Sequence, residues 1–143
     1  MSDERVKSEA LPKGWVCTTI GEIATVNKRN PALRDLHDSL PVTFAPMAAV
    51  DADAGTIANP EQRNLSQVRK GFTPFANGDV IFAKITPSME NGKAAIARDL
   101  INGYGFGSTE FHVISPYVDI SPEFIFYFIR QQSFIRDAKA HIA

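Results

Sequence analysis

The sequence predicts an α+β fold, a single domain in which an apolar C-terminal helix covers a twisted, mixed or antiparallel sheet of short strands with β-hairpin loops. Short β-prone stretches alternate with turn signals through most of the chain, and an apolar helical pattern occurs only near its end. The length of 143 residues is enough for one packed domain and too short for two comfortable ones.

The composition excludes several classes of protein. The chain is 44% hydrophobic and 22% charged and has no low-complexity tract, so disorder is not its main state. Its one cysteine, Cys17, excludes a disulfide framework and a cysteine-based zinc site, and it fits a reducing cytosol. Because no apolar run could span a membrane and the N-terminus carries no secretory signal, we expect a cytoplasmic protein without a membrane partner.

The first forty residues are predicted to be mostly irregular. Residues 1–10 form a flexible lead-in to a domain that covers residues 11–143. Residues 15–20 are β-prone, and one helical turn over residues 21–24 follows them. The polar stretch 27–40 is expected to be an irregular loop.

The next segment is predicted to pair short strands across a turn. Residues 41–50 form a strand region whose Pro46 indicates a sheet edge or a bulge. An aspartate-rich stretch over residues 51–55 ends in glycine and indicates a turn, after which residues 56–58 start a return strand. Residues 61–70 fit either a short helix or an ordered loop, because their periodicity does not decide between the two.

The strongest strand signals lie in the middle of the chain. Residues 79–85 are apolar on both faces, as in a central strand, and they follow a turn at Asn77-Gly78. Asn91-Gly92 is a strong hairpin signal, so residues 93–98 are predicted to be the partner strand.

Toward the C-terminus the sequence predicts a loop, a strand and a helix. Residues 102–107, NGYGFG, form a glycine-rich loop, and residues 108–114 then alternate between two faces as in a strand. Ser121 and Pro122 suit the start of a helix over residues 122–134. Five of its residues are expected to pack on the sheet because they are too apolar to face water: Phe124, Ile125, Tyr127, Phe128 and Ile129.

The sequence contains no complete catalytic or cofactor-binding motif. Residues 87–94 have proline where a phosphate-binding loop has its first glycine and alanine where it has a hydroxyl. The glycines of residues 103–107 precede a strand, unlike those of a dinucleotide-binding turn. The histidines, His37, His112 and His141, lack metal-ligand spacing. We therefore expect no catalytic residue, no metal site and no cofactor in this chain.

The basic residues are unevenly distributed along a chain whose net charge is −1. Residues 63–98 contain six basic and two acidic residues, a local charge of +4, which permits a cationic face toward a polyanion. A solvated surface with scattered lysines explains the same pattern. The candidates for contacts with a nucleic-acid backbone form two basic pairs, Lys28 with Arg29 and Arg69 with Lys70.

Some loops carry side chains that suit the reading of base edges. Asparagine and lysine bond adenine and guanine edges, and a two-stranded ribbon fits the major groove of DNA. The candidates for base readout are Lys84, Thr86, Ser88, Asn91 and Lys93 at the hairpin, and Ser108 and Thr109 after the glycines. The alternative is that these residues serve hairpin and turn geometry alone.

Several ordered blocks of the sequence resemble the specificity subunits of type I restriction-modification systems. The opening LPKGWVCTTIGEIA is similar to the start of a target recognition domain in that family. The blocks GDVIFAKITPSMENGKAAIA (78–97) and GFGSTEFHVISP (105–116) resemble one class of these domains. RKGFTPFANGD (69–79) and the apolar segment that ends at Ala143 also match, so the resemblance runs from Leu11 to the end.

The resemblance implies a non-catalytic domain that reads one half of a split double-stranded DNA site. In the family, modification subunits that bind S-adenosylmethionine join the specificity subunit to form a methyltransferase. Restriction subunits that use ATP and Mg²⁺ complete the complex, so these cofactors are expected only in partner subunits. The family continues beyond the position of Ala143 into a helical spacer and a second domain, so we expect an isolated first recognition domain, either an engineered fragment or the product of a truncated gene.

A protein-interaction module is the alternative function. In that case the apolar helix 122–134 docks a partner and the domain has no DNA readout of its own. A small nucleotide-dependent enzyme that uses residues 103–108 and Lys93 is a third alternative.

Overall fold

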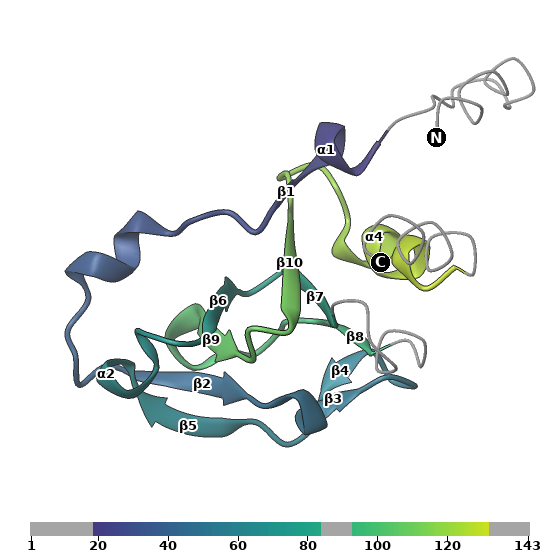
Figure 1. The fold of residues 1–143 in the computed structure, drawn as a ribbon. Helices are drawn as coiled ribbons and strands as arrows, with labels where there is room; N and C mark the ends of the chain where they lie inside the picture. The colour runs from purple at the N-terminus through teal and green to yellow at the C-terminus, as the bar shows by residue number, and fades with distance from the viewer. Residues whose placement is uncertain (1–18, 84–92, 132–143) are drawn as a thin grey trace, which may run out of the picture.

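The computed structural model of the protein describes residues 19–83 and 93–131. In that part of the chain the strands form two four-stranded sheets and one two-stranded hairpin, with short helical segments on the outer faces (Figure 1). The predicted α+β class, the short strands and the hairpins are confirmed. The expected sheet is divided in two, because β9 and β10 follow each other in the chain but join different sheets.

The first sheet is antiparallel throughout. Its strand order is β1 (Ala24–Val26), β10 (Phe111–Pro116), β7 (Val80–Ala83) and β8 (Ala94–Ile96). Ile81 of β7 pairs with Val113 on one side and with Ala95 on the other. The predictions of a central strand after Asn77-Gly78 and of its hairpin partner are therefore confirmed.

The second sheet is mixed. Its strand order is β5 (Glu61–Asn64), β2 (Pro41–Ala45), β9 (Tyr104–Gly107) and β6 (Thr73–Ala76). β2 and β9 run parallel, and the other two pairs are antiparallel. The mixed character follows from β9, which lies between two strands from earlier in the chain.

The predicted glycine-rich loop is wrong for most of its length, because residues 104–107 are the interior strand β9. A Cβ at Gly105 would lie 2.3 Å from the ring of Phe75, and one at Gly107 would lie 2.8 Å from the ring of Phe111. The glycines therefore let two aromatic rings lie close to the backbone of a strand. Only the short 3₁₀ turn η4 (Ile101–Gly103) precedes it.

Two further expectations for the second sheet need correction. β2 has neighbours on both sides, so Pro46 does not mark an edge strand; it ends the strand and precedes the 3₁₀ turn η3 (Met47–Ala49). Residues 61–70 begin with strand β5 and continue into the helical turn α2 (Leu65–Val68). The backbone N–H of Asn64 donates to Oε1 of Gln67 at 2.9 Å, which fixes the start of that turn.

A small hairpin lies at the edge of the first sheet. β3 (Val50–Asp51) pairs with β4 (Thr56–Ile57) across the predicted turn. Oδ1 of Asp51 accepts hydrogen bonds from the backbone N–H groups of Asp53 and Ala54, at 3.0 and 3.1 Å. The aspartate side chain thus holds the turn closed, as its position in the sequence indicates.

Helical segments cover the outer faces of both sheets. The helical turn α1 (Ile20–Ile23) and helix α4 (Pro122–Ile129) pack on the first sheet, with Ile125 and Ile129 in contact with its core. The 3₁₀ turn η2 (Pro31–Asp35) and α2 cover the second sheet. The layers explain why three apolar clusters form: one between the sheets and one under each outer layer.

Helix α4 buries only part of its apolar surface. Ile125, Phe126 and Ile129 are buried, but Phe124 is 56% exposed and Tyr127 is 66% exposed. The prediction that all five apolar residues pack on the sheet is wrong for these two, because they lie on the outer side of the helix. Among the described residues no helix is long and apolar enough to cross a membrane.

Candidate nucleic-acid interface

Strand ends from both sheets meet on one side of the molecule. β7 ends at Ala83 opposite Phe111, where β10 begins. β9 ends at Gly107 opposite Thr73, where β6 begins. Residues 108–110 join Gly107 to Phe111, so the same end of each sheet contributes to one surface.

Asn27 attaches the segment after β1 to this surface. Its backbone N–H donates to the carbonyl of Val113 at 2.7 Å, and its Oδ1 accepts the N–H of Val113 at 2.7 Å. Its Nδ2 donates to Nδ1 of His112 at 3.0 Å. Asn27 has φ of 50°, a left-handed conformation that asparagine tolerates better than most residues. The group of strand-end residues, called the polar rim below, consists of residues 27–30, Thr73 and residues 108–112.

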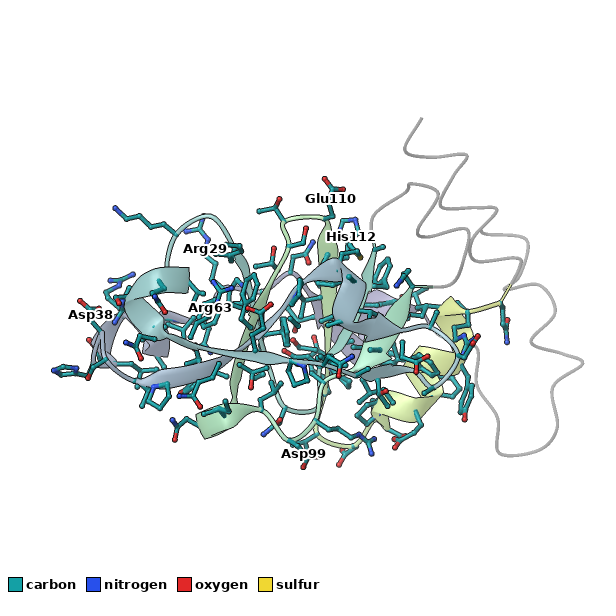
Figure 2. The ribbon with its side chains drawn as sticks, turned by 90° about the horizontal axis from the view of Figure 1, so that it is seen from below. Arg29, Asp38, Arg63, Asp99, Glu110 and His112 are labelled. Atoms are coloured by element: carbon teal, nitrogen blue, oxygen red, sulfur yellow. The ribbon has the colours of Figure 1, made fainter. Side chains whose placement is uncertain are left out.

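The rim carries basic side chains that the fold leaves unpaired. Lys28 and Arg29 are exposed, and neither forms an ion pair with any residue in the described ranges. Figure 2 shows Arg29, Glu110 and His112 toward one edge of the molecule, while Asp99 lies at the opposite edge. An exposed cation that forms no ion pair is available to a phosphate group.

Arg69 has a different environment from its neighbour Lys70. The Nε of Arg69 donates to Oδ1 of Asp38 at 2.7 Å, and its two terminal nitrogens donate to the carbonyls of Leu33, at 2.8 Å, and Leu36. These bonds tie α2 to the segment around η2. Its contact with a DNA phosphate stays a prediction, for which two N–H groups of the guanidinium remain. Lys70 is exposed and has no ion pair among the residues described.

The base-readout candidates separate into three groups. Nζ of Lys93 donates to the carbonyl of Val50 at 2.9 Å, so this side chain helps to hold β3 against β8. Oγ of Ser108 accepts the N–H of Glu110 at 3.0 Å, a turn contact, whereas Thr109 is exposed on the rim. The remaining candidates lie outside the described residues: Lys84, Thr86, Ser88 and Asn91.

A cleft of about 270 Å³ opens beside the rim, between residues 28–31 and the strands β6 and β10. Asp79 lies in it and is 7% exposed, with its Oδ2 accepting the N–H of Ala76 at 2.9 Å. Burial raises the pKa of the Asp79 carboxyl above its usual 3.8. The Ala76 hydrogen bond, the nearby Ser115 hydroxyl and the charge of Lys28 oppose this effect. The cleft therefore combines a desolvated acid with cations at its opening.

Three residues near this surface escape prediction from the sequence. Asp79 stands at the start of a stretch that is apolar on both faces, and a carboxylate in such a place is a usable signal for a buried acid. No local signal marks Ser115, since its burial depends on contacts between distant segments. Arg34 on η2 is a further exposed cation, and it belongs to the loop 27–40 that the sequence predicts only as irregular.

The described residues contain no group of three or more histidine, cysteine or acidic side chains that could hold a metal ion. The surface offers cations, amides and hydroxyls, which bind a polyanion and form hydrogen bonds with base edges. His112 lies against Phe82, with ring centroids 5.2 Å apart, and bonds to Asn27. His112 is therefore a strand histidine with a hydrogen-bond partner.

Comparisons with known proteins find similar sequences in one functional class. The chain is 42% identical over 117 residues to the type I restriction enzyme EcoAI specificity subunit of Escherichia coli, covering 82% of this chain and 19% of that protein. It is 40% identical over 113 residues to the EcoEI specificity subunit of Escherichia coli, covering 79% and 18%. The chain thus spans about a fifth of the length of the curated relatives it matches. No protein-family model matches the sequence.

Solved structures with the same fold come from the same kind of system. The HsdS subunit from Thermoanaerobacter tengcongensis has a TM-score of 0.71 and 26% identity, over 93% of this chain and 33% of that one. A chain from a solved type I R-M system, studied for its complex assembly and conformational transition, has a TM-score of 0.70 and 24% identity, over 92% and 33%. The second likeness concerns the fold alone.

Proposed function

We propose that this chain, which belongs to the same sequence family as a segment of the type I restriction enzyme specificity subunits, is a target recognition domain. In this proposal it binds double-stranded DNA and reads one half of a split recognition site. The observation that carries the proposal is the polar rim, where the ends of both sheets present Lys28 and Arg29 without acidic partners among the described residues. Surfaces of this kind bind phosphates, while neighbouring loops contact base edges.

The proposed roles of the rim residues follow from their environments. Lys28, Arg29 and Lys70 contact DNA phosphates, and Arg69 uses its remaining N–H groups in the same way. Thr109 and Ser108 lie where they can meet a base edge. β7 ends opposite the start of β10, and β8 begins opposite Phe82 beside that end, which favours base readout by the loop candidates Lys84, Thr86, Ser88 and Asn91. Lys93 would take part through the ammonium N–H groups that do not bond to Val50.

The wider role of the chain is also part of the proposal. It directs modification subunits, which carry S-adenosylmethionine, and restriction subunits, which use ATP and Mg²⁺, to the DNA. The chain itself has no catalytic role and needs no cofactor in this account. Its target is DNA, which places its action in the cytoplasm of a bacterium or archaeon.

The exposed side chains of α4 favour a second candidate function. Phe124 and Tyr127 lie on the outer side of the helix, and Tyr117 and Val118, which precede it, are also exposed. These residues follow the far end of β10, away from the rim. A partner protein that docks here would leave DNA binding intact, and sedimentation of the chain alone tests whether the helix drives self-association.

The salt dependence of DNA binding tests the proposed function. If about four cations contact phosphates, the logarithm of the association constant should fall with the logarithm of salt concentration at a slope of about −3.6. The measurement is a fluorescence-anisotropy titration of a labelled duplex with the 143-residue chain between low and physiological salt. Binding that does not depend on salt, or no binding at low salt, would contradict the proposal.

A further inference from the structure

The cleft beside the polar rim contains two buried polar groups on its floor. Asp79 reaches it from the start of β7, and Ser115 reaches it from β10. Ser115 is 4% exposed, and a weak hydrogen bond from its hydroxyl helps to lower the pKa of the Asp79 carboxyl, although no contact of its Oγ among the described residues has regular hydrogen-bond geometry. The buried hydroxyl oxygen beside the carboxyl therefore keeps acceptor capacity for a donor group of a ligand.

The walls and the opening of the cleft differ chemically from its floor. Pro74 and Phe75 supply apolar surface on one side. Lys28 and Arg29 stand at the opening on the other side. An inorganic anion would match the cations but would meet the carboxyl of Asp79 at the floor. A metal ion would match Asp79 but would lie close to the positive charge of Lys28.

One class of ligand matches all of these features at once. A nucleotide joins an anionic phosphate to a flat base, and adenine and cytosine carry an exocyclic amino group that donates hydrogen bonds. We propose that the cleft binds a single amino-bearing nucleotide, with the amino group toward Asp79 and Ser115 and the phosphate toward Lys28 and Arg29. A volume of about 270 Å³ corresponds to roughly nine water molecules, enough for a base and part of its sugar.

The nucleotide has two possible sources with the same chemistry. It is either a residue of bound DNA that has turned out of the helix, or a free nucleotide. The first source rests on the proposed function, since it requires DNA on the rim. Proteins that hold an extrahelical base read it by hydrogen bonds to its edge and by contacts of its faces with apolar side chains, as this cleft provides.

Free nucleotides test the site without any DNA. Deoxyadenosine and deoxycytidine monophosphates are titrated into the isotope-labelled chain, with deoxythymidine monophosphate as the ligand that lacks the amino group. We expect NMR chemical-shift changes at Ala76, Asp79 and Ser115. The affinities for the adenine and cytosine nucleotides should be at least fivefold above that for the thymine nucleotide. Equal affinity for all three, or shifts confined to Lys28 and Arg29, would overturn the proposal.

Ser115→Ala separates binding from folding. Loss of one hydrogen bond to the amino group should weaken binding about two- to tenfold. The melting temperature should change little, because the hydroxyl forms only a weak bond to Asp79. Ser66→Ala on the exposed side of α2 is the matched control and should change neither quantity. If Ser115→Ala binds the nucleotides like the wild type, the hydroxyl has another partner and the proposal fails.

Duplexes with one bulged base distinguish the two sources. If the nucleotide comes from DNA, a bulged adenine should raise affinity over the fully paired duplex, a bulged thymine should not, and Ser115→Ala should reduce the gain. If the source is a free nucleotide, the bulge has no effect, but deoxyadenosine monophosphate still binds. Failure of every duplex to bind contradicts the proposed function alone, because the nucleotide titration decides the inference separately.

Discussion

The basic side chains at the two ends of the segment that joins β1 to β2 have opposite environments: one is hydrogen-bonded within the protein, and the others face solvent. At its far end, Arg69 contacts Leu33, Leu36 and Asp38 through three donor nitrogens and is 28% exposed. At its near end, Lys28 and Arg29 are exposed and form no ion pair within the described ranges. A pair of basic residues in the sequence therefore does not predict whether the two charges are available to a phosphate. The fold decides which cations form hydrogen bonds within the protein and which face solvent.

The basic residues of the segment 63–98, which has a high local charge, also differ in whether they have partners within the protein. Arg63 forms an ion pair with Glu61, Arg98 with Glu123, and Arg69 with Asp38. Lys93 bonds to a backbone carbonyl. The charge of +4 over residues 63–98 therefore does not make a cationic face by itself, and the free cations of the rim come largely from outside that segment.

Removal of Arg69 should have the largest effect on stability. Arg69→Ala leaves two backbone carbonyls without their donor, and we expect the free energy of unfolding to fall by about 2–3 kcal/mol in urea denaturation. Arg69→Lys keeps the charge but not the planar fork, so it should recover less than half of the loss. A variant as stable as the wild type would show that these hydrogen bonds do not hold the segment.

Removal of both free cations should affect DNA binding and leave stability intact. Lys28→Ala with Arg29→Ala should lower the salt slope by about 1.8 in magnitude, from about 0.9 per phosphate contact. The free energy of unfolding should change by less than about 0.5 kcal/mol. Anisotropy titrations at several salt concentrations measure the first effect, and urea denaturation measures the second. An unchanged slope would remove these residues from the interface.

Asp79 should make stability depend on pH in a defined direction. Its folded pKa is raised above 3.8, mainly by burial, so the folded protein keeps this proton to higher pH than the unfolded chain does. Its contribution to stability is fully present below pH 3.8 and is lost as the pH rises through the raised pKa. Asp79→Asn cannot ionise, so its free energy of unfolding relative to the wild type should increase with pH above 3.8. A difference that does not vary with pH would contradict the burial of this charge.

The ion pair at α4 should have the smallest effect. Hydrogen bonds from Arg98 and then Ser121 lower the pKa of Glu123 from 4.5 to about 2. Its contribution is fully present above pH 4.5 and is lost as the pH falls through about 2. Because Glu123 is exposed, Glu123→Gln should lower the melting temperature only slightly at pH 7 and by less at pH 2. Scanning calorimetry at both values measures the difference.

Local signals predicted those parts of the fold that depend on neighbouring residues. The pairing of β7 with β8, the turn held by Asp51 and the helix that starts after Ser121 all belong to this class. β9 escaped prediction because its glycines make room for aromatic rings, and one of these rings belongs to Phe75, which is distant in the sequence. The strand β5 has an exposed, polar sequence and is formed by pairing with β2.

Prediction of the candidate site from the sequence has the same limit, because the site depends on contacts between distant segments. Residue types identified the segments that meet at the rim, and the register of the strands brings them together. Whether a cation is free, as Lys28 is, or bound, as Arg69 is, depends on acceptors contributed by other segments. The buried pair of Asp79 and Ser115 likewise exists only through the packing of β7 against β10.

Selection of DNA from a randomised duplex library is the most direct test of whether this domain reads a DNA sequence. The 143-residue chain and its Lys28→Ala, Arg29→Ala variant are each incubated with the library at low salt, and the retained duplexes are sequenced. We expect the wild type to enrich one motif of about three to five base pairs and the variant to retain less DNA. No retention by the wild type, or retention equal to that of the variant and without any enriched motif, would contradict a DNA-reading role for this domain.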